Sequence, residues 1–254
     1  MSCRGVLRAL PLLLAAWPPA AQAQTDEIEI YDAEIAGPGQ FDATLHNNFS
    51  PDGLKQPRFP GASVSNHSWN GTLETAYGMA DWWELGLYMP VYSFSQSGPQ
   101  FDGGKLRSLF VVPDAAHRTF FYGVNIELSV NNRHWEDHSP SLEIRPILGL
   151  HIGKWDLISN PIIDSGFNGP GNASFAPAER IAYNFTGPYA VALEHYADYG
   201  PLQAMAPLNR SYQEVFGAVD YKLDTANSFE FGAGFGLTSA SDRVLLKLII
   251  NHQF

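Results

Sequence analysis

Short runs in which apolar and polar residues alternate recur along the chain from residue 39 to residue 254. In one run, Phe120, Tyr122 and Val124 on one side alternate with Gly123 and Asn125 on the other. A period of two places the two sets on opposite faces of a β-strand. Each run has about the 9–11 residues that a tilted membrane-crossing strand needs, and no apolar run after residue 23 reaches the roughly 20 residues of a membrane helix.

The runs add up to an even number of strands. We expect twelve, at residues 39–49, 66–79, 83–93, 103–112, 118–130, 140–152, 155–165, 174–184, 188–199, 211–221, 228–239 and 243–254. Connections after the even-numbered strands are short, whereas most of the others are long and rich in Gly, Pro, Ser and Asn. An even strand count with short turns at one end and long loops at the other is typical of bacterial outer-membrane proteins. The predicted fold is therefore all-β, an antiparallel up-and-down transmembrane barrel of about twelve strands.

Two runs show the predicted faces in detail. In the last one, Val244, Leu246 and Leu248 share a face that ends at Phe254, whereas Lys247 lies on the other face. A terminal strand that ends on Phe resembles the signal read by the outer-membrane assembly machinery, so Phe254 is the predicted membrane-insertion signal. In the run at 83–93, Trp83, Leu85, Leu87, Met89 and Val91 are expected to face lipid.

The first residues have the features of an export signal. Arg4 and Arg8 precede a short apolar stretch, and Ala21-Gln22-Ala23 is a small-x-small cleavage pattern. We expect a signal peptide at 1–23, a periplasmic N-terminal segment at 24–38 and the barrel domain at 39–254. The expected location is the bacterial outer membrane, surrounded by outer-membrane lipid and lipopolysaccharide.

Composition excludes several classes of function. The only cysteine, Cys3, lies in the predicted signal peptide, which leaves no cysteine nucleophile or cysteine metal site. The formal net charge is −11 and becomes more negative when Arg4 and Arg8 are removed. Nucleic acid, which requires a basic surface, is therefore not an expected partner.

The alternation places most of the charged strand residues on the inner face. The predicted lumen-lining residues are Asp42, Glu74, Glu84, Tyr88, Lys105, Arg107, Glu127, Glu143, Arg145, Asp156, Glu194, Tyr196, Asp198, Glu214, Asp220, Glu230 and Lys247. Their acidic excess fits a wet channel that favours cations. The same residues also fit an ion-pair network that plugs a narrow barrel, with Tyr88, Phe121, Tyr196 and Phe216 filling gaps.

Three glycines, Gly232, Gly234 and Gly236, share the inner face of one strand. They either widen a passage or let a large side chain from elsewhere lie flat against the wall. The second interpretation is favoured.

Catalytic and metal sites are not expected. Ser159 and His195 are predicted to project toward lipid, as in lipid-cleaving barrels, but a strand separates them and no third orienting group is evident. His46 and His151 face the lumen and are expected to hydrogen-bond neighbouring carboxylates. His134, Glu136, Asp137 and His138 share one external loop without a defined metal-ligand spacing. No cofactor is expected.

Several segments resemble a known family. They are residues 29–35, residues 77–88 with Tyr77-Gly78 and Asp81-Trp82, Ser159-Asn160-Pro161, and residues 193–196. They resemble the outer-membrane barrel family of transporters and porins associated with meta-pathway phenol degradation. The resemblance implies a porin for a small solute, such as an aromatic or weakly polar organic compound. Two alternatives stay open: a plugged barrel that binds partners through its external loops, and a lipid hydrolase on the barrel wall.

Overall fold

The computed structural model describes residues 27–167 and 173–254, so the predicted signal peptide at 1–23 lies outside the described residues. The strands are β1 (Phe41–Asp52), β2 (Trp69–Ala80), β3 (Trp83–Ser95), β4 (Gly98–Asp102), β5 (Lys105–Val111), β6 (Phe120–Ser129), β7 (Ser141–Ile152), β8 (Trp155–Asn160), β9 (Ile163–Gly166), β10 (Ala173–Phe175), β11 (Ala178–Asn184), β12 (Tyr189–Asp198), β13 (Tyr212–Lys222), β14 (Asn227–Gly236) and β15 (Val244–Gln253). One short 3₁₀ helix, Ala115–His117, precedes β6. Within the described part of the chain, no helix has the length and hydropathy needed to cross a membrane.

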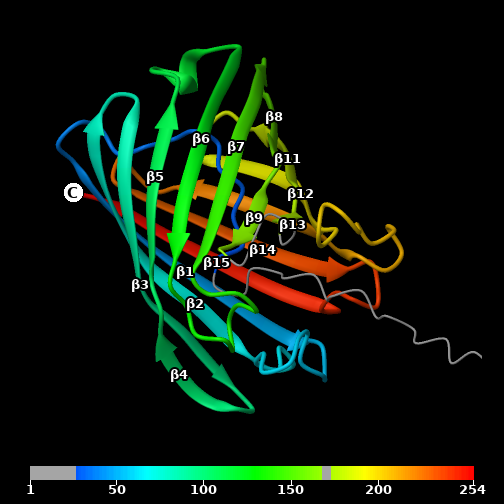
Figure 1. Ribbon diagram of the computed structural model, residues 1–254. Coiled ribbons are helices and arrows are strands. Elements are labelled where there is room, and N and C mark those ends of the chain that lie inside the picture. The colour runs from blue at the N-terminus through cyan, green and yellow to red at the C-terminus, as the bar shows by residue number, and fades with distance from the viewer. Residues whose placement is uncertain (1–26, 168–172) are drawn as a thin grey trace, which may run out of the picture.

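The strands close into one antiparallel barrel (Figure 1). β1 pairs with β15, and the pairing of β7 with β8 completes the circle. The prediction of a twelve-strand barrel is confirmed for the described residues, because β4, β9 and β10 extend predicted strands or hairpins rather than adding positions to the circle. Two predicted strands are interrupted where Pro161 separates β8 from β9 and Pro177 separates β10 from β11. Proline lacks the N–H that a continuous ladder requires at those positions.

Burial is inverted relative to a water-soluble protein. Along β6, Phe121, Glu127 and Ser129 are buried, whereas Phe120 and Tyr122 are exposed on the outside. The same arrangement holds around the wall: charged side chains point into the barrel and large apolar ones point out. A sheet with this distribution is stable where its outer surface meets lipid and its inner groups pair with one another.

One predicted face changes within β3. Val91 was expected on the outer face with Leu87 and Met89, but it is fully buried inside the barrel. The pairing of β2 with β3 shifts register between Thr72 and Glu74, opposite this part of β3. Pro90, which precedes Val91, has no N–H for the ladder, and the irregularity reverses the alternation beyond it.

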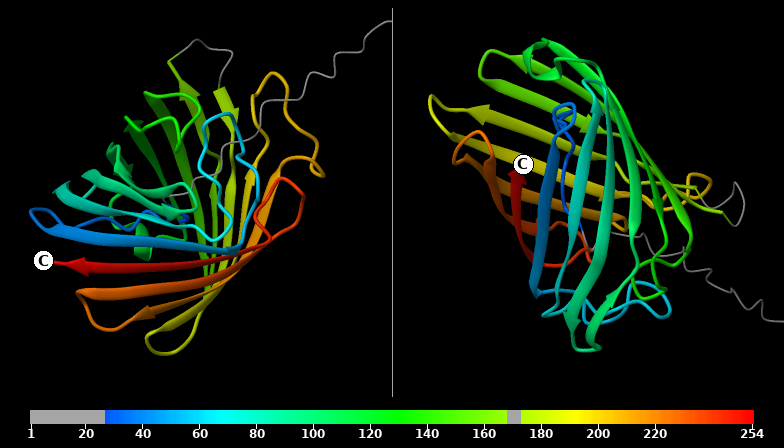
Figure 2. Two further views of the ribbon diagram at one scale, coloured as in Figure 1. Left: turned by 90° about the horizontal axis from the view of Figure 1, so that it is seen from below. Right: turned by 90° about the vertical axis from the view of Figure 1, so that its left-hand side faces the viewer.

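The two ends of the barrel differ. At the turn end, strands are joined by residues 81–82, 112–119, 153–154, 185–188 and 223–226. At the loop end, the connections include residues 53–68, 130–140 and 199–211, and the β3–β4 hairpin extends beyond the wall (Figures 1 and 2). This asymmetry agrees with the predicted short turns and long loops.

The residues before β1 lie inside the barrel. Residues 27–36 include the buried side chains of Ile28, Ile30, Tyr31 and Ala33, which pack on the inner wall. A turn at 37–40 joins this segment to β1, with Gly39 N donating to Gly78 O at 2.8 Å. Residues 24–38 were expected to lie in the periplasm. The structure instead places 27–36 within the lumen, and we call these ten residues the inner segment.

Candidate functional site in the barrel lumen

A cavity of about 650 Å³ occupies part of the barrel interior. The inner segment forms one side of it, and wall residues such as Asp42, Glu74 and Glu230 form the others. Residues of two turns, Phe185, Gly187 and Pro188 in one and Asp224, Thr225 and Ala226 in the other, also line the cavity, so it reaches the turn end of the barrel. Any solute that crosses the lumen has to pass this space and the inner segment beside it.

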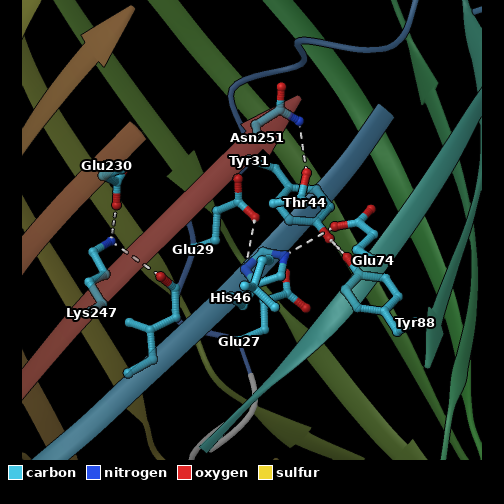
Figure 3. A network of polar contacts seen from close by, with 12 residues as sticks. Glu27, Glu29, Tyr31, Thr44, His46, Glu74, Tyr88, Glu230, Lys247 and Asn251 are labelled. Carbon is cyan, nitrogen blue, oxygen red and sulfur yellow. Dashed lines mark hydrogen bonds and ion pairs between the residues drawn. The ribbon is translucent and has the colours of Figure 1, made fainter. Parts of the chain in front are cut away.

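Tyr31 is the main anchor of the inner segment. Its hydroxyl hydrogen-bonds the Tyr88 hydroxyl at 2.5 Å, as Figure 3 shows. The guanidinium groups of Arg107 and Arg145 lie over its ring at 5.4 and 4.3 Å from the centroid. Desolvated cation–π contacts of this kind stabilise by about 2 kcal/mol. Tyr31 therefore joins the segment to two separate wall cations.

Backbone groups of the inner segment also bind the wall. Lys247 Nζ donates to Ile28 O at 3.2 Å, and Ala36 N donates to Glu84. The inner segment has no strand partner along this stretch, and buried backbone N–H and C=O groups need hydrogen-bond partners. The wall side chains supply such partners.

Many of the buried charges in the described part of the wall fall into three groups, one of which surrounds Glu27. Lys105 Nζ lies 3.2 Å from Glu127 and 3.8 Å from Glu27. Arg145 Nε lies 2.6 Å from Glu143, and Arg145 Nη1 lies 3.4 Å from Glu27. Glu27 comes from the inner segment, so this group ties the segment to β5 and β7.

A second group surrounds Arg107. Its guanidinium binds Glu74 and Glu84, with Nε donating to Glu74 Oε1 at 2.5 Å. The other Glu74 oxygen, Oε2, lies 3.2 Å from His46 Nε2. His46 was expected to hydrogen-bond a neighbouring carboxylate, and this contact agrees with that expectation.

The third group lies across the barrel and contains two cations. Arg180 binds Glu194, Asp220 and Glu230. Lys247 binds Glu194 at 2.6 Å and also Glu230. Glu194 and Lys247 are both fully shielded from solvent. The buried charges are therefore shared among several partners rather than left as isolated ions.

The structure places the predicted lumen residues inside the barrel. Buried there are Glu74, Glu84, Tyr88, Lys105, Arg107, Glu127, Glu143, Arg145, Glu194, Asp198, Glu214 and Lys247. Partly exposed to the interior are Asp42, Asp156, Tyr196, Asp220 and Glu230, of which all but Tyr196 line the cavity. An ion-pair network fills much of the lumen, and a cavity remains beside it.

The glycines of β14 give space to large neighbours. A Cβ on Gly232 would lie 2.8 Å from Lys247 Cε, and one on Gly234 would lie 2.5 Å from Phe216 Cζ. The structure therefore supports the favoured interpretation, in which side chains from β15 and β13 lie flat against this strip of the wall.

Four residues that connect the inner segment and the charged groups of the lumen were not predicted from the sequence. Glu27 and Tyr31 precede the first strand, where no alternation indicates a face. Asn160 is fully buried and hydrogen-bonds the backbone of Tyr31. Arg180 shares its inward face with the small residues Ala178 and Ala182. Their alternation with larger apolar residues is the signal from which its inward orientation could have been predicted.

The candidate catalytic and metal-binding residues lie apart from one another, on the wall and in the loops. His195 hydrogen-bonds Glu179 at 3.0 Å and Gln213 at 2.7 Å. In the pairing of β8 with β11, Ser159 stands opposite Glu179. Glu179 therefore lies between Ser159 and His195. His151 binds Asp156 at 2.6 Å. In the 130–140 loop, His134 lies 3.2 Å from Asp102, Glu136 accepts bonds from Asn131 and Ser141, and Asp137 lies 3.7 Å from His138.

At the loop end, Asp242 holds the 53–68 loop over the barrel. It accepts hydrogen bonds from Leu54 N at 2.6 Å, from Arg58 Nη2 at 2.9 Å and from Ser65. The Arg58 guanidinium also lies over the Tyr212 ring. Burial opposes the charge of Arg58, but the acidic groups around it, of which Asp242 acts most strongly, together outweigh burial and raise the pKa of the guanidinium. One carboxylate thus fixes much of this loop.

Comparison with solved structures identifies outer-membrane barrels of similar fold. The KdgM porin has a TM-score of 0.55 at 11% identity, over 84% of this chain and 99% of that one. A COG4313 outer membrane channel from Pseudomonas putida F1 has a TM-score of 0.58 at 14% identity, over 90% and 100%. The NanC porin has a TM-score of 0.53 at 6% identity, over 84% and 98%. At these identities the likeness shows the fold, which is that of porin-like barrels.

No protein-family model matches the chain. No curated protein matches it either.

Proposed function

We propose that this protein is a narrow outer-membrane channel for passive diffusion of a small solute. The observation that carries the proposal is the polar cavity of about 650 Å³ that reaches the turn end of a closed barrel. A cavity of this size lies within the range of about 300–1,000 Å³ that holds small molecules in proteins. The porin-like fold and the expected export signal support the outer-membrane location.

The inner segment is the main obstruction of this channel. It is attached to the wall by side-chain contacts at Glu27 and Tyr31 and by hydrogen bonds between its backbone and wall side chains, rather than by a strand ladder. Each such contact stabilises by about 0.5–3 kcal/mol. A segment held this way exchanges between seated and displaced states more readily than a wall strand. We propose that conduction increases when the segment leaves its seat.

Planar-bilayer recordings test this proposal. Tyr31→Phe removes the hydrogen bond to Tyr88 and keeps the ring between Arg107 and Arg145, whereas Tyr31→Ala removes both. We expect small or infrequent steps for the unmodified protein and a graded rise from Tyr31→Phe to Tyr31→Ala. Tyr122→Phe, at an exposed position on the outer face of β6 and away from the cavity, is the matched control. Silence of all variants that show the heat-modifiable band of a folded barrel would leave a plugged, loop-binding barrel as the function.

The class of solute is a finer proposal. An aromatic or weakly polar organic compound is supported by the resemblance of residues 77–88 to the meta-pathway phenol-degradation family. A KdgM porin of similar fold, solved in complex with disordered oligogalacturonate, has a TM-score of 0.52 at 13% identity. That ligand belongs to the other barrel, and it makes sugars the second class of solute to test. Swelling rates of proteoliposomes in neutral aromatic solutes and in sugars of equal size distinguish the two classes for this chain.

A further inference from the structure

His46 has two ring nitrogens in different surroundings, although its side chain is only 1% exposed. Nε2 faces Glu74 Oε2 at 3.2 Å. Nδ1 has no hydrogen-bond partner, and the nearest charged atom across from it is Glu29 Oε2 at 3.9 Å. Figure 3 shows Glu29 of the inner segment and Glu74 of β2 approaching the ring of His46.

The bond to Glu74 decides which nitrogen is free. A neutral imidazole that donates its Nε2 hydrogen to a carboxylate keeps a lone pair on Nδ1, and this is the form of the ring that binds a metal ion. Two groups that both offer lone pairs, Nδ1 and the Glu29 carboxylate, then face one another in a buried place. Their separation of 3.9 Å is too long for a direct hydrogen bond, so a proton alone does not satisfy Nδ1.

A bound cation fits this geometry. Metal–nitrogen and metal–oxygen bonds of about 2.0–2.2 Å put two ligand atoms about 3.3–3.4 Å apart in a tetrahedral site. Glu29 therefore has to move by roughly half an ångström. It lies on a segment without strand pairing and its side chain is 30% exposed to the cavity, so it has this freedom.

The surroundings resemble the outer shell of known metal centres. A histidine that binds a metal usually gives its other ring N–H to a carboxylate, which fixes the ring and its tautomer. Glu74 occupies that position and is itself held by Arg107, through the oxygen that does not face His46. Glu27, two residues before Glu29, has one buried oxygen without a hydrogen-bond partner, and its charge acts on His46.

The local charge also favours a cation. Arg107 is shared by Glu74 and Glu84, so one positive charge faces two carboxylates. Among the described residues, the ion pairs of Glu29 include no lysine or arginine. The cavity gives ions a route from the turn end and leaves room for water to complete the coordination shell.

We propose that His46 Nδ1 and the Glu29 carboxylate bind a divalent transition-metal ion such as Zn²⁺, with Glu74 as the positioning residue behind the imidazole. A nitrogen and carboxylate donor set suits this class of ion. Because Glu29 belongs to the inner segment and His46 to the wall, the bound ion links the two. The site requires only the described arrangement in the lumen, so it does not depend on whether the barrel conducts.

Binding of Co²⁺ to the purified full chain in detergent tests the site. Visible absorption bands report Co²⁺ coordination, and we expect one equivalent to bind. His46→Gln and Glu29→Gln should remove this equivalent. Glu74→Gln should weaken it about 10–100-fold, as outer-shell changes do. His151→Gln, which removes another lumen histidine paired with a carboxylate, is the matched control and should bind normally.

A second control and a second measurement keep the result unambiguous. The double variant His134→Gln/His138→Gln removes the histidines of the 130–140 loop and should retain the equivalent. Loss of binding in that variant instead of in His46→Gln would assign the ion to the loop and overturn the proposal. If the lumen variants fail to fold, electron spin-echo spectra of Cu²⁺ bound to the unmodified protein still report a coordinated imidazole. Absence of that signal, or of any bound equivalent, would mean that a proton or water occupies the position.

Discussion

Asn160 holds both backbone polar groups of Tyr31, a residue 129 positions earlier in the chain. Tyr31 N donates to Asn160 Oδ1 at 2.8 Å, and Asn160 Nδ2 donates to Tyr31 O at 3.0 Å. The side-chain amide thus takes the place of a neighbouring strand at one point of the inner segment. Because Asn160 ends β8 just before Pro161, the wall is interrupted where it grips the segment.

Replacing Asn160 should release the inner segment. Asn160→Ala removes two hydrogen bonds, each worth about 0.5–1.5 kcal/mol, so the displaced state should become roughly tenfold more populated. The labelling rate of a cysteine at Ile30, which is buried in the seated state, measures this population. Asn184→Ala, at the far end of β11, is the control. Equal labelling rates in the two backgrounds would show that Asn160 does not hold the segment.

Glu194 should be essential for stability rather than for ion selectivity. It is shared by Arg180 and Lys247, so Glu194→Gln weakens the pairing of two buried cations and should lower the free energy of unfolding by a few kcal/mol. Neutralising Glu127 and Glu194 together should lower the free energy of unfolding further, since Glu127 pairs with Lys105. Urea unfolding followed by gel mobility measures the change. Retention of full stability in Glu194→Gln would imply that water already reaches these charges.

Asp42 should affect selectivity without affecting stability. It lines the cavity, and its Oδ1 has no hydrogen-bond partner. Exposed charges act over about 8 Å at physiological ionic strength, so Asp42→Asn should reduce cation preference, and the difference should fade in high salt. The reversal potential in a salt gradient is the measurement. An unchanged potential would exclude Asp42 from the conduction path.

Gly234 should not tolerate a side chain. A Cβ there meets the fully buried Phe216 ring, so Gly234→Ala should destabilise the barrel by about 1–3 kcal/mol. Gly217 on β13 has no atom within 4 Å of its Cβ position, and Gly217→Ala is the matched control. Thermal midpoints of gel mobility compare the two variants. Equal midpoints would mean that Phe216 adopts another position easily.

The orientation of the barrel can be tested with single cysteines. Ser97→Cys and Asn132→Cys, both at the loop end, should react with an impermeant reagent added to intact cells. Thr225→Cys, in the turn between β13 and β14, should not react. All three positions are exposed, so differences in labelling report sidedness rather than burial. Labelling of Thr225→Cys alone would mean that the turn end, rather than the loop end, faces the outside of the cell.

Much of the wall follows from local sequence. Alternation with a period of two assigns the face of a residue from its immediate neighbours, which is why Glu127 and Lys247 were placed inward correctly. The rule fails where the backbone breaks its period, as at Pro90, where Val91 turns inward. The role of Phe254 as an insertion signal stays a prediction. It is 72% exposed beyond β15, and its N–H donates to Phe41 O at 2.7 Å.

Strand faces and turn lengths are local properties, so alternation and connection lengths are enough to predict a twelve-strand barrel with charged residues inside. How those charges are paired, and the position of residues 27–36 among them, depend on contacts between distant parts of the chain. Glu29, His46 and Glu74 come from the inner segment, β1 and β2, and no spacing in the chain indicates that they meet. A segment without alternation carries no local signal for its path. Its position depends on contacts such as Tyr31 with Asn160, which exist only after the barrel has closed around it.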